Sequence, residues 1–84
     1  MEHGLVTLRL VDAAGAPVAV AFVTIAAASA AFPERAFVPD ETGRVSIALP
    51  VGTAVLEVRF AGLEPRRIEV EARVGGELEV TLIR

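Results

Sequence analysis

The sequence predicts an all-β domain, a seven-stranded antiparallel β-sandwich with Greek-key connections. Hydrophobic and polar residues alternate at a period of two in most segments, and no segment shows the period near 3.6 of an amphipathic helix. Turn-forming residues recur about every ten residues, which is the spacing of a sandwich or a small barrel. Because 84 residues, 54% of them hydrophobic, can bury one thin core, we expect residues 1–84 to form a single domain.

Each expected strand is defined by this alternation. In residues 5–12, Val6, Leu8 and Leu10 share one face, while Thr7, Arg9 and Val11 share the other. The other six expected strands are residues 18–26, 36–38, 44–49, 54–60, 67–72 and 77–83. In the last four of these strands, the side chains expected to face the core are Val45, Ile47, Leu49, Ala54, Leu56, Val58, Phe60, Ile68, Val70, Ala72, Leu78, Val80 and Leu82.

Short turns separate these strands. Glycine supplies a positive φ, proline fixes φ, and an aspartate such as Asp40 can accept hydrogen bonds from the backbone two residues on. Turn residues of these kinds occupy residues 14–17, 40–43, 50–52, 62–65 and 74–76. We expect the last of them, with its two adjacent glycines, to close a hairpin.

Composition excludes several classes of function. The formal net charge of -3 opposes nucleic-acid binding, which needs a clustered positive field. The chain has no cysteine and one histidine, so we expect no metal site and no cofactor. The uncharged stretch of residues 13–33 is rich in alanine, interrupted by glycine and proline, and preceded by acidic residues, which argues against a membrane span or a signal peptide. Six residue types are missing, which indicates either a GC-rich genome or a designed sequence.

The polar candidates for chemistry have simpler structural explanations. His3 could act as a base or ligand, but we expect it in a frayed terminus. A hydroxyl acts as a nucleophile only beside an activating base. We instead expect the hydroxyl residues on exposed strand faces or in the alanine-rich loop; they are Ser29, Ser46, Thr7, Thr24 and Thr81. The acidic residues Asp12, Asp40 and Glu41 lie at turns and could supply oxygen ligands to a calcium ion. We favour the alternative that they stabilise the turns by hydrogen bonding to the backbone. Glu77 and Glu79 are expected on one exposed strand face, where they repel each other.

Several segments together resemble a known family. They are VTLRLVDAAGAPV at residues 6–18, AFVTI at 21–25, DETGRV at 40–45 and LPVGTAVLEV at 49–58, followed by Gly62. This pattern resembles carboxypeptidase regulatory-like domains, which implies a transthyretin-like (prealbumin) β-sandwich and a non-catalytic module. The chain departs from the pattern at Pro39, Val20 and Ala54, where Thr, Gly and an aromatic residue are usual. It lacks the Lys and Asn of isopeptide-forming modules, the several histidines of transthyretin-like hydrolases, and the Trp and Tyr of sugar-binding sandwiches.

We therefore expect a non-enzymatic module with a structural or protein-binding role, whose partner is another protein or a second copy. If Val18, Ala21, Val23 and Ile25 face the core, as the resemblance implies, then Val20 and Phe22 face outward, and with Phe32 they form the expected contact surface. The open alternative is that the loop of residues 26–33 folds over them and closes them into the core. A designed immunoglobulin-like scaffold with no evolved ligand is the second hypothesis, and an enzyme is disfavoured by the residue inventory.

Overall fold

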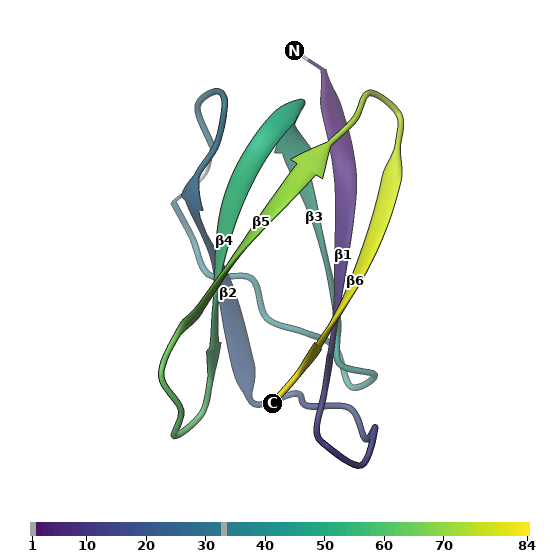
Figure 1. Cartoon of the computed structure of the whole chain (residues 1–84), viewed down its shortest axis with the longest axis vertical. Helices are drawn as coiled ribbons and strands as arrows, with labels where there is room; N and C mark the ends of the chain where they lie inside the picture. Colours follow the sequence, from purple (N-terminus) through teal and green to yellow (C-terminus); the bar gives the residue numbers. More distant parts are fainter. Residues whose placement is uncertain (1, 33) are drawn as a thin grey trace.

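The chain folds into a β-sandwich of two three-stranded sheets (Figure 1). The computed structural model describes residues 2–32 and 34–84. Within these residues the strands are β1 (His3–Val11), β2 (Ala21–Ala27), β3 (Arg44–Pro50), β4 (Gly52–Phe60), β5 (Arg66–Ala72) and β6 (Glu77–Ile83). One sheet has the order β3-β1-β6 and the other the order β2-β4-β5. The predicted all-β class and two-layer architecture are confirmed.

The pairing of β6 differs from the prediction. β1 pairs antiparallel with β3 but parallel with β6, whereas β2, β4 and β5 pair antiparallel throughout. The turn at residues 74–76 therefore joins strands of different sheets, so the expectation of a hairpin there and of a fully antiparallel fold is wrong. The reason is that the chain crosses the sandwich after β5, which brings β6 alongside β1 in the same direction. Of the connections between these strands, the one from β4 to β5 joins neighbours in the same sheet, and the other four pass from one sheet to the other.

The expected strand at residues 36–38 is a single bridge instead of a strand. Val23 and Phe37 exchange two backbone hydrogen bonds, of 2.8 and 2.7 Å, and no further pairing follows. Pro39 ends the segment, because a proline has no N–H to donate to a ladder. The structure thus has six strands in the described residues, not seven. The strand expected at residues 18–26 begins later, at Ala21, because Val18 donates its N–H to Leu10 O of β1 at 2.9 Å.

The core lies between the two sheets, as the alternation predicts. The inward side chains of β3 and β4 are almost fully buried, and no charged or polar residue is buried among the described residues. Val11 was expected to face outward, yet it is 5% exposed, because the chain folds back and pairs Pro17 with it. Leu78, Val80 and Leu82 were expected to be in the core, but Leu78 is exposed and the other two are half-buried. The sandwich is therefore closed less completely along β6.

Two aspartates hold the turns, as expected. Asp12 Oδ1 accepts the N–H groups of Ala14 and Ala16, each at 2.9 Å. Asp40 Oδ1 accepts the Thr42 N–H at 2.8 Å, the Thr42 hydroxyl at 2.5 Å and the Arg44 N–H at 3.1 Å. These bonds satisfy backbone donors that the turns leave without sheet partners. The carboxylates thus fix the two reversals that precede β2 and β3.

Candidate functional site

An apolar hollow lies where the chain enters β2. Val20 is 72% exposed and Phe22 is 40% exposed, and both line this hollow. The register of β2 on β4 pairs Phe22 with Arg59, and the Val20 carbonyl accepts the Ala61 N–H at 3.3 Å. The hollow is lined by Ala19, Val20, Ala21, Phe22, Arg59, Phe60 and Ala61. The prediction that Val20 and Phe22 face outward is thus matched by their exposure.

Phe32 lies apart from this hollow. It is half-buried, packs against the edge of the core, and lines a second depression with Thr24 and Ile25. The loop of residues 26–33 therefore contributes an aromatic ring to the core margin, while Val20 and Phe22 stay uncovered; Pro33 lies outside the described residues. The three residues expected to form one surface are placed in two neighbouring depressions along β2.

A tight contact anchors the loop that carries Phe32. The Ser29 hydroxyl donates a hydrogen bond to Val51 O at 2.6 Å, at the corner between β3 and β4. Gly52 has a φ of 122°, and a Cβ there would lie 3.0 Å from Ser29 Oγ. The glycine therefore allows the serine to approach the corner closely. This contact explains why the loop packs beside β4 and leaves the entrance to β2 open.

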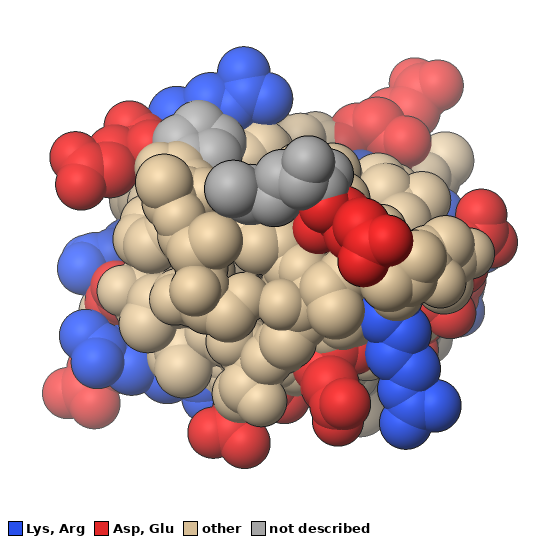
Figure 2. Space-filling view, turned by 90° about the horizontal axis from the view of Figure 1, so that it is seen from above, with Lys and Arg blue, Asp and Glu red and all other residues tan. Residues whose placement is uncertain are grey.

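Charge around the apolar surface is mixed. Figure 2 looks onto the opposite end of the long axis, where β1 and β4 begin, and there uncharged side chains occupy the centre with acidic and basic side chains around the perimeter. Near the hollow, Arg59 forms an exposed ion pair with Glu57 at 3.1 Å. The Arg66 guanidinium lies 5.5 Å from the centre of the Phe60 ring. Charged side chains beside an apolar surface, such as Arg59 and Arg66 beside this hollow, are typical of the rim of protein contact surfaces.

One titratable group has a shifted pKa. The hydrogen bond from the Thr42 hydroxyl, followed by that from the Arg44 N–H, lowers the pKa of Asp40 from its ordinary value of 3.8. Both donors stabilise the charged carboxylate. This shift belongs to the turn before β3 and not to the hollow.

The polar candidates from the sequence do not converge on one site. His3 lies in β1, not in a frayed terminus, and its carbonyl accepts the Gly75 N–H at 3.4 Å. Thr7 Oγ1 and Ser46 Oγ lie 2.9 Å apart on the outer face of β1 and β3. Among residues 2–32 and 34–84, no three His, Cys, Asp or Glu side chains gather in a way that could hold a metal ion. Glu77 and Glu79 are exposed on β6, as predicted.

Sequence reasoning missed the other residues of the hollow. Arg59, Phe60 and Ala61 come from the end of β4, and they meet Val20 and Phe22 through the β2–β4 register. The alternation in residues 54–60 places Phe60 inward and Arg59 outward, but it does not identify β2 as the neighbour. A cross-strand partner is a long-range property that a single strand pattern does not contain.

Comparison with known families identifies the chain. The model of the carboxypeptidase regulatory-like domain matches residues 6–83. The chain belongs to the carboxypeptidase regulatory-like domain family. The segments that carried the resemblance lie in β1, β2, β3 and β4 and in the turn held by Asp40. The comparison with curated proteins gives no match.

A solved structure supports the fold of this carboxypeptidase regulatory-like domain. The Bacillus anthracis TIE protein superposes with a TM-score of 0.80 at 15% sequence identity. The alignment covers 98% of the present chain and 16% of the TIE protein chain, so the domain corresponds to a small part of that larger protein. At this identity the likeness concerns the fold alone. The described residues contain no helix of the length and apolar character needed to cross a bilayer.

Proposed function

We propose that this carboxypeptidase regulatory-like domain is a non-enzymatic module that binds protein through the hollow formed by Val20 and Phe22. The observation that carries the proposal is the exposure of two large apolar side chains in one depression, 72% for Val20 and 40% for Phe22. Phe32, in the neighbouring depression, extends the contact surface along β2. The bound protein is a second copy or another chain.

The chemistry of the hollow supports this role. Phe22 is an aromatic residue whose side chain is 40% exposed on the outer face of β2, opposite Arg59, whereas Phe60 faces the core. Covering an exposed aromatic ring favours binding, because the ring buries a large apolar area and has little side-chain entropy to lose. Arg59 lines the same hollow and supplies a polar rim.

The arrangement of hydroxyl groups favours a binding role over catalysis. Ser29 donates to a backbone carbonyl, and Thr7 and Ser46 bond each other on an exposed face. A catalytic hydroxyl needs a base within hydrogen-bond reach, and these bonds are structural. Membership of a regulatory-like family supports the same proposal, and supports an evolved module over a designed scaffold. We also propose that the strand connections are those of the transthyretin-like Greek key.

The test is the solution mass of the wild type, of Phe22→Asp and of the control Val74→Asp, measured by light scattering across a concentration series. Val74 is 59% exposed in the turn between β5 and β6, away from the hollow. We expect association that weakens on dilution, persists in Val74→Asp and is abolished in Phe22→Asp. A strictly monomeric wild type contradicts self-association at this face. Unfolding of Phe22→Asp, followed by circular dichroism, would place the ring in the core instead.

A further inference from the structure

Strand β6 differs from the other three edge strands in how well its inner side chains are covered. The inward residues of β3 are at most 6% exposed, and β2 and β5 each have a single half-buried inward residue, Ala21 and Ile68, beside two buried ones. On β6, by contrast, Leu78 is 39% exposed, while Val80 and Leu82 are half-buried. Figure 1 looks onto this side of the sandwich, with β5 and β6 in front and the connection from β2 to β3 behind. An apolar row is therefore left partly open at the β6 edge.

The backbone of β6 has hydrogen-bonding groups directed away from the sheet. At the two ends of the strand, the Gly76 carbonyl accepts the Leu5 N–H at 3.0 Å and the Arg84 N–H donates to Val11 O at 2.7 Å. Even-numbered residues thus bond to β1, and strand alternation turns the groups of residues 77, 79 and 81 outward. The Ile83 carbonyl, on the same outward side, accepts a hydrogen bond from Arg66 Nη1.

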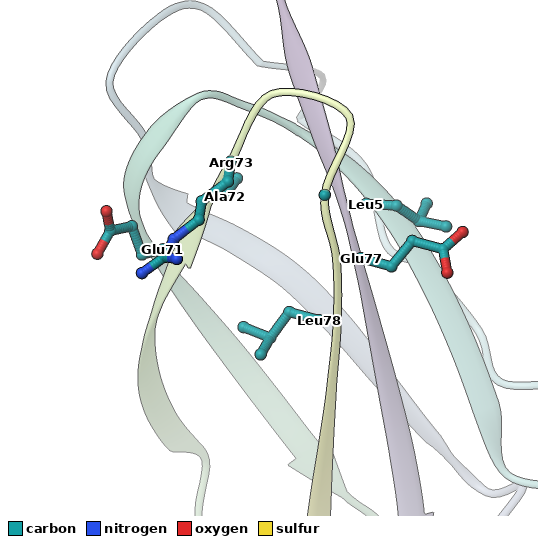
Figure 3. A pocket seen from close by; sticks show the side chains of 7 residues that line it. Leu5, Glu71, Ala72, Arg73, Glu77 and Leu78 are labelled. Atoms are coloured by element: carbon teal, nitrogen blue, oxygen red, sulfur yellow. The ribbon is translucent and has the colours of Figure 1, made fainter.

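The charged side chains along the first half of β6 are acidic, whereas Arg66 lies at the end of the strand. Glu77 and Glu79 are exposed on the outer face of β6, and neither forms an ion pair with another described residue. A hollow lies at the start of the strand, where Leu78 points into the space between β6 and β5, and Glu77 and Glu71 point to opposite outer sides (Figure 3). The edge therefore combines an uncovered apolar row on one face with two unpaired carboxylates on the other.

We infer that β6 accepts an added β-strand whose residues alternate between apolar and basic. In antiparallel pairing, the apolar residues of such a strand cover Leu78, Val80 and Leu82, and its basic residues lie opposite Glu77 and Glu79. Its backbone bonds the outward groups of residues 77, 79 and 81. A second copy fits less well, because its own β6 brings two more carboxylates to the same face and each chain carries a formal net charge of -3. This inference is independent of the hollow at Val20 and Phe22.

The test uses a fluorescent, end-blocked heptapeptide in which arginine and valine alternate, titrated with the wild-type domain. Two N-methylated versions control for strand pairing. Methylation of the arginine nitrogens removes the N–H groups directed at β6, and methylation of the valine nitrogens removes those directed away. We expect the first to abolish the anisotropy change and the second to retain it. Amide shifts in NMR spectra should be largest at residues 77–83.

Two domain variants test the charge contribution. Opposite-charge pairs across strands contribute modest interaction energies. The double variant Glu77→Gln with Glu79→Gln should therefore weaken peptide binding roughly 2- to 30-fold. The control, Glu64→Gln with Glu69→Gln, removes the same charge from exposed sites in the turn before β5 and on β5, and should leave the affinity unchanged. Thr81→Pro removes an outward N–H without removing a bond to β1, and should also abolish binding. Thermal unfolding checks that this variant folds.

Several outcomes would overturn the inference. The first is no binding of the peptide at millimolar concentration, and the second is equal binding of both methylated peptides. The third is an equal loss of peptide affinity in the two double glutamate-to-glutamine variants. In the first case the carboxylates protect the edge from pairing. A wild-type dimer that Thr81→Pro converts to monomer would assign the edge to a second copy instead. Phe22→Asp should bind the peptide like the wild type, so failure of the proposed function is distinguishable from failure at β6.

Discussion

Gly43 combines a left-handed backbone with a close approach to the neighbouring strand. Its φ is 78°, and a Cβ placed on it would lie 2.4 Å from Leu10 O and 3.2 Å from Pro17 Cβ. The Gly43 carbonyl also accepts the Leu10 N–H at 2.8 Å. Because the nearest atom belongs to the backbone of β1, no side-chain rotation relieves the contact. We therefore predict that Gly43→Ala strongly destabilises the domain.

The magnitude follows from two contributions. A non-glycine residue in the left-handed region costs about 1–2 kcal/mol. Moving β1 away from the new methyl group weakens the bond between Leu10 and Gly43, which adds roughly 0.5–1.5 kcal/mol. The sum is about 1.5–3.5 kcal/mol, a large part of the roughly 4–13 kcal/mol expected for a domain of this size. The melting temperature should fall by about 6–28 °C.

Gly62 provides a matched control for this prediction. Its φ is 77°, almost that of Gly43, but a Cβ there would meet no atom within 4 Å. Gly62→Ala therefore carries the conformational penalty alone, about 1–2 kcal/mol. The assay is urea denaturation of both variants, followed by circular dichroism. Equal losses in the two variants would refute the close contact between Gly43 and β1.

Two further predictions concern the turn at Asp40 and the core. Because hydrogen bonds lower the folded-state pKa of Asp40 below 3.8, its contribution to stability is complete above that pH and is lost as pH falls through the folded value. Asp40→Asn should reduce the acid dependence of the unfolding free energy between about pH 5 and 2, and an unchanged dependence would contradict the role of the Thr42 hydroxyl. Leu56 is 0% exposed, so Leu56→Ala should lower the free energy of unfolding by about 2–5 kcal/mol. Leu63→Ala, at 48% exposure, should change stability by at most about 0.5 kcal/mol in the same urea titrations, and similar losses would contradict the burial.

The faces of the strands were predictable from the sequence. Val45, Ile47 and Leu49 alternate with Arg44, Ser46 and Ala48, and each side chain lies on the expected side. This works because a strand buried on one face requires a period of two, whatever its neighbours are. The outward placement of Phe22 followed from the resemblance to the family, and its exposure agrees with it.

The pairing of the strands was not predictable in the same way. Nothing in the alternation of residues 77–83 distinguishes a hairpin partner of β5 from a parallel neighbour of β1, because both leave the same side chains inward. Phe32 was misplaced for a related reason: it lies in a loop without periodicity, and the hydrogen bond from Ser29 to Val51 sets its position. The hollow beside β2 depends on the register with β4, which is also a long-range property.

The parallel pairing of β1 and β6 has a mechanical consequence. Strand β1 begins near one end of the long axis, which measures 37 Å, and β6 runs from that end toward the other (Figure 1). A pull between the ends runs along β1 and β6 and slides one strand past the other. The evenly spaced hydrogen bonds of this pair then carry the load together instead of opening one after another. A force along this axis should therefore meet more resistance than it would if the two strands opened from one end.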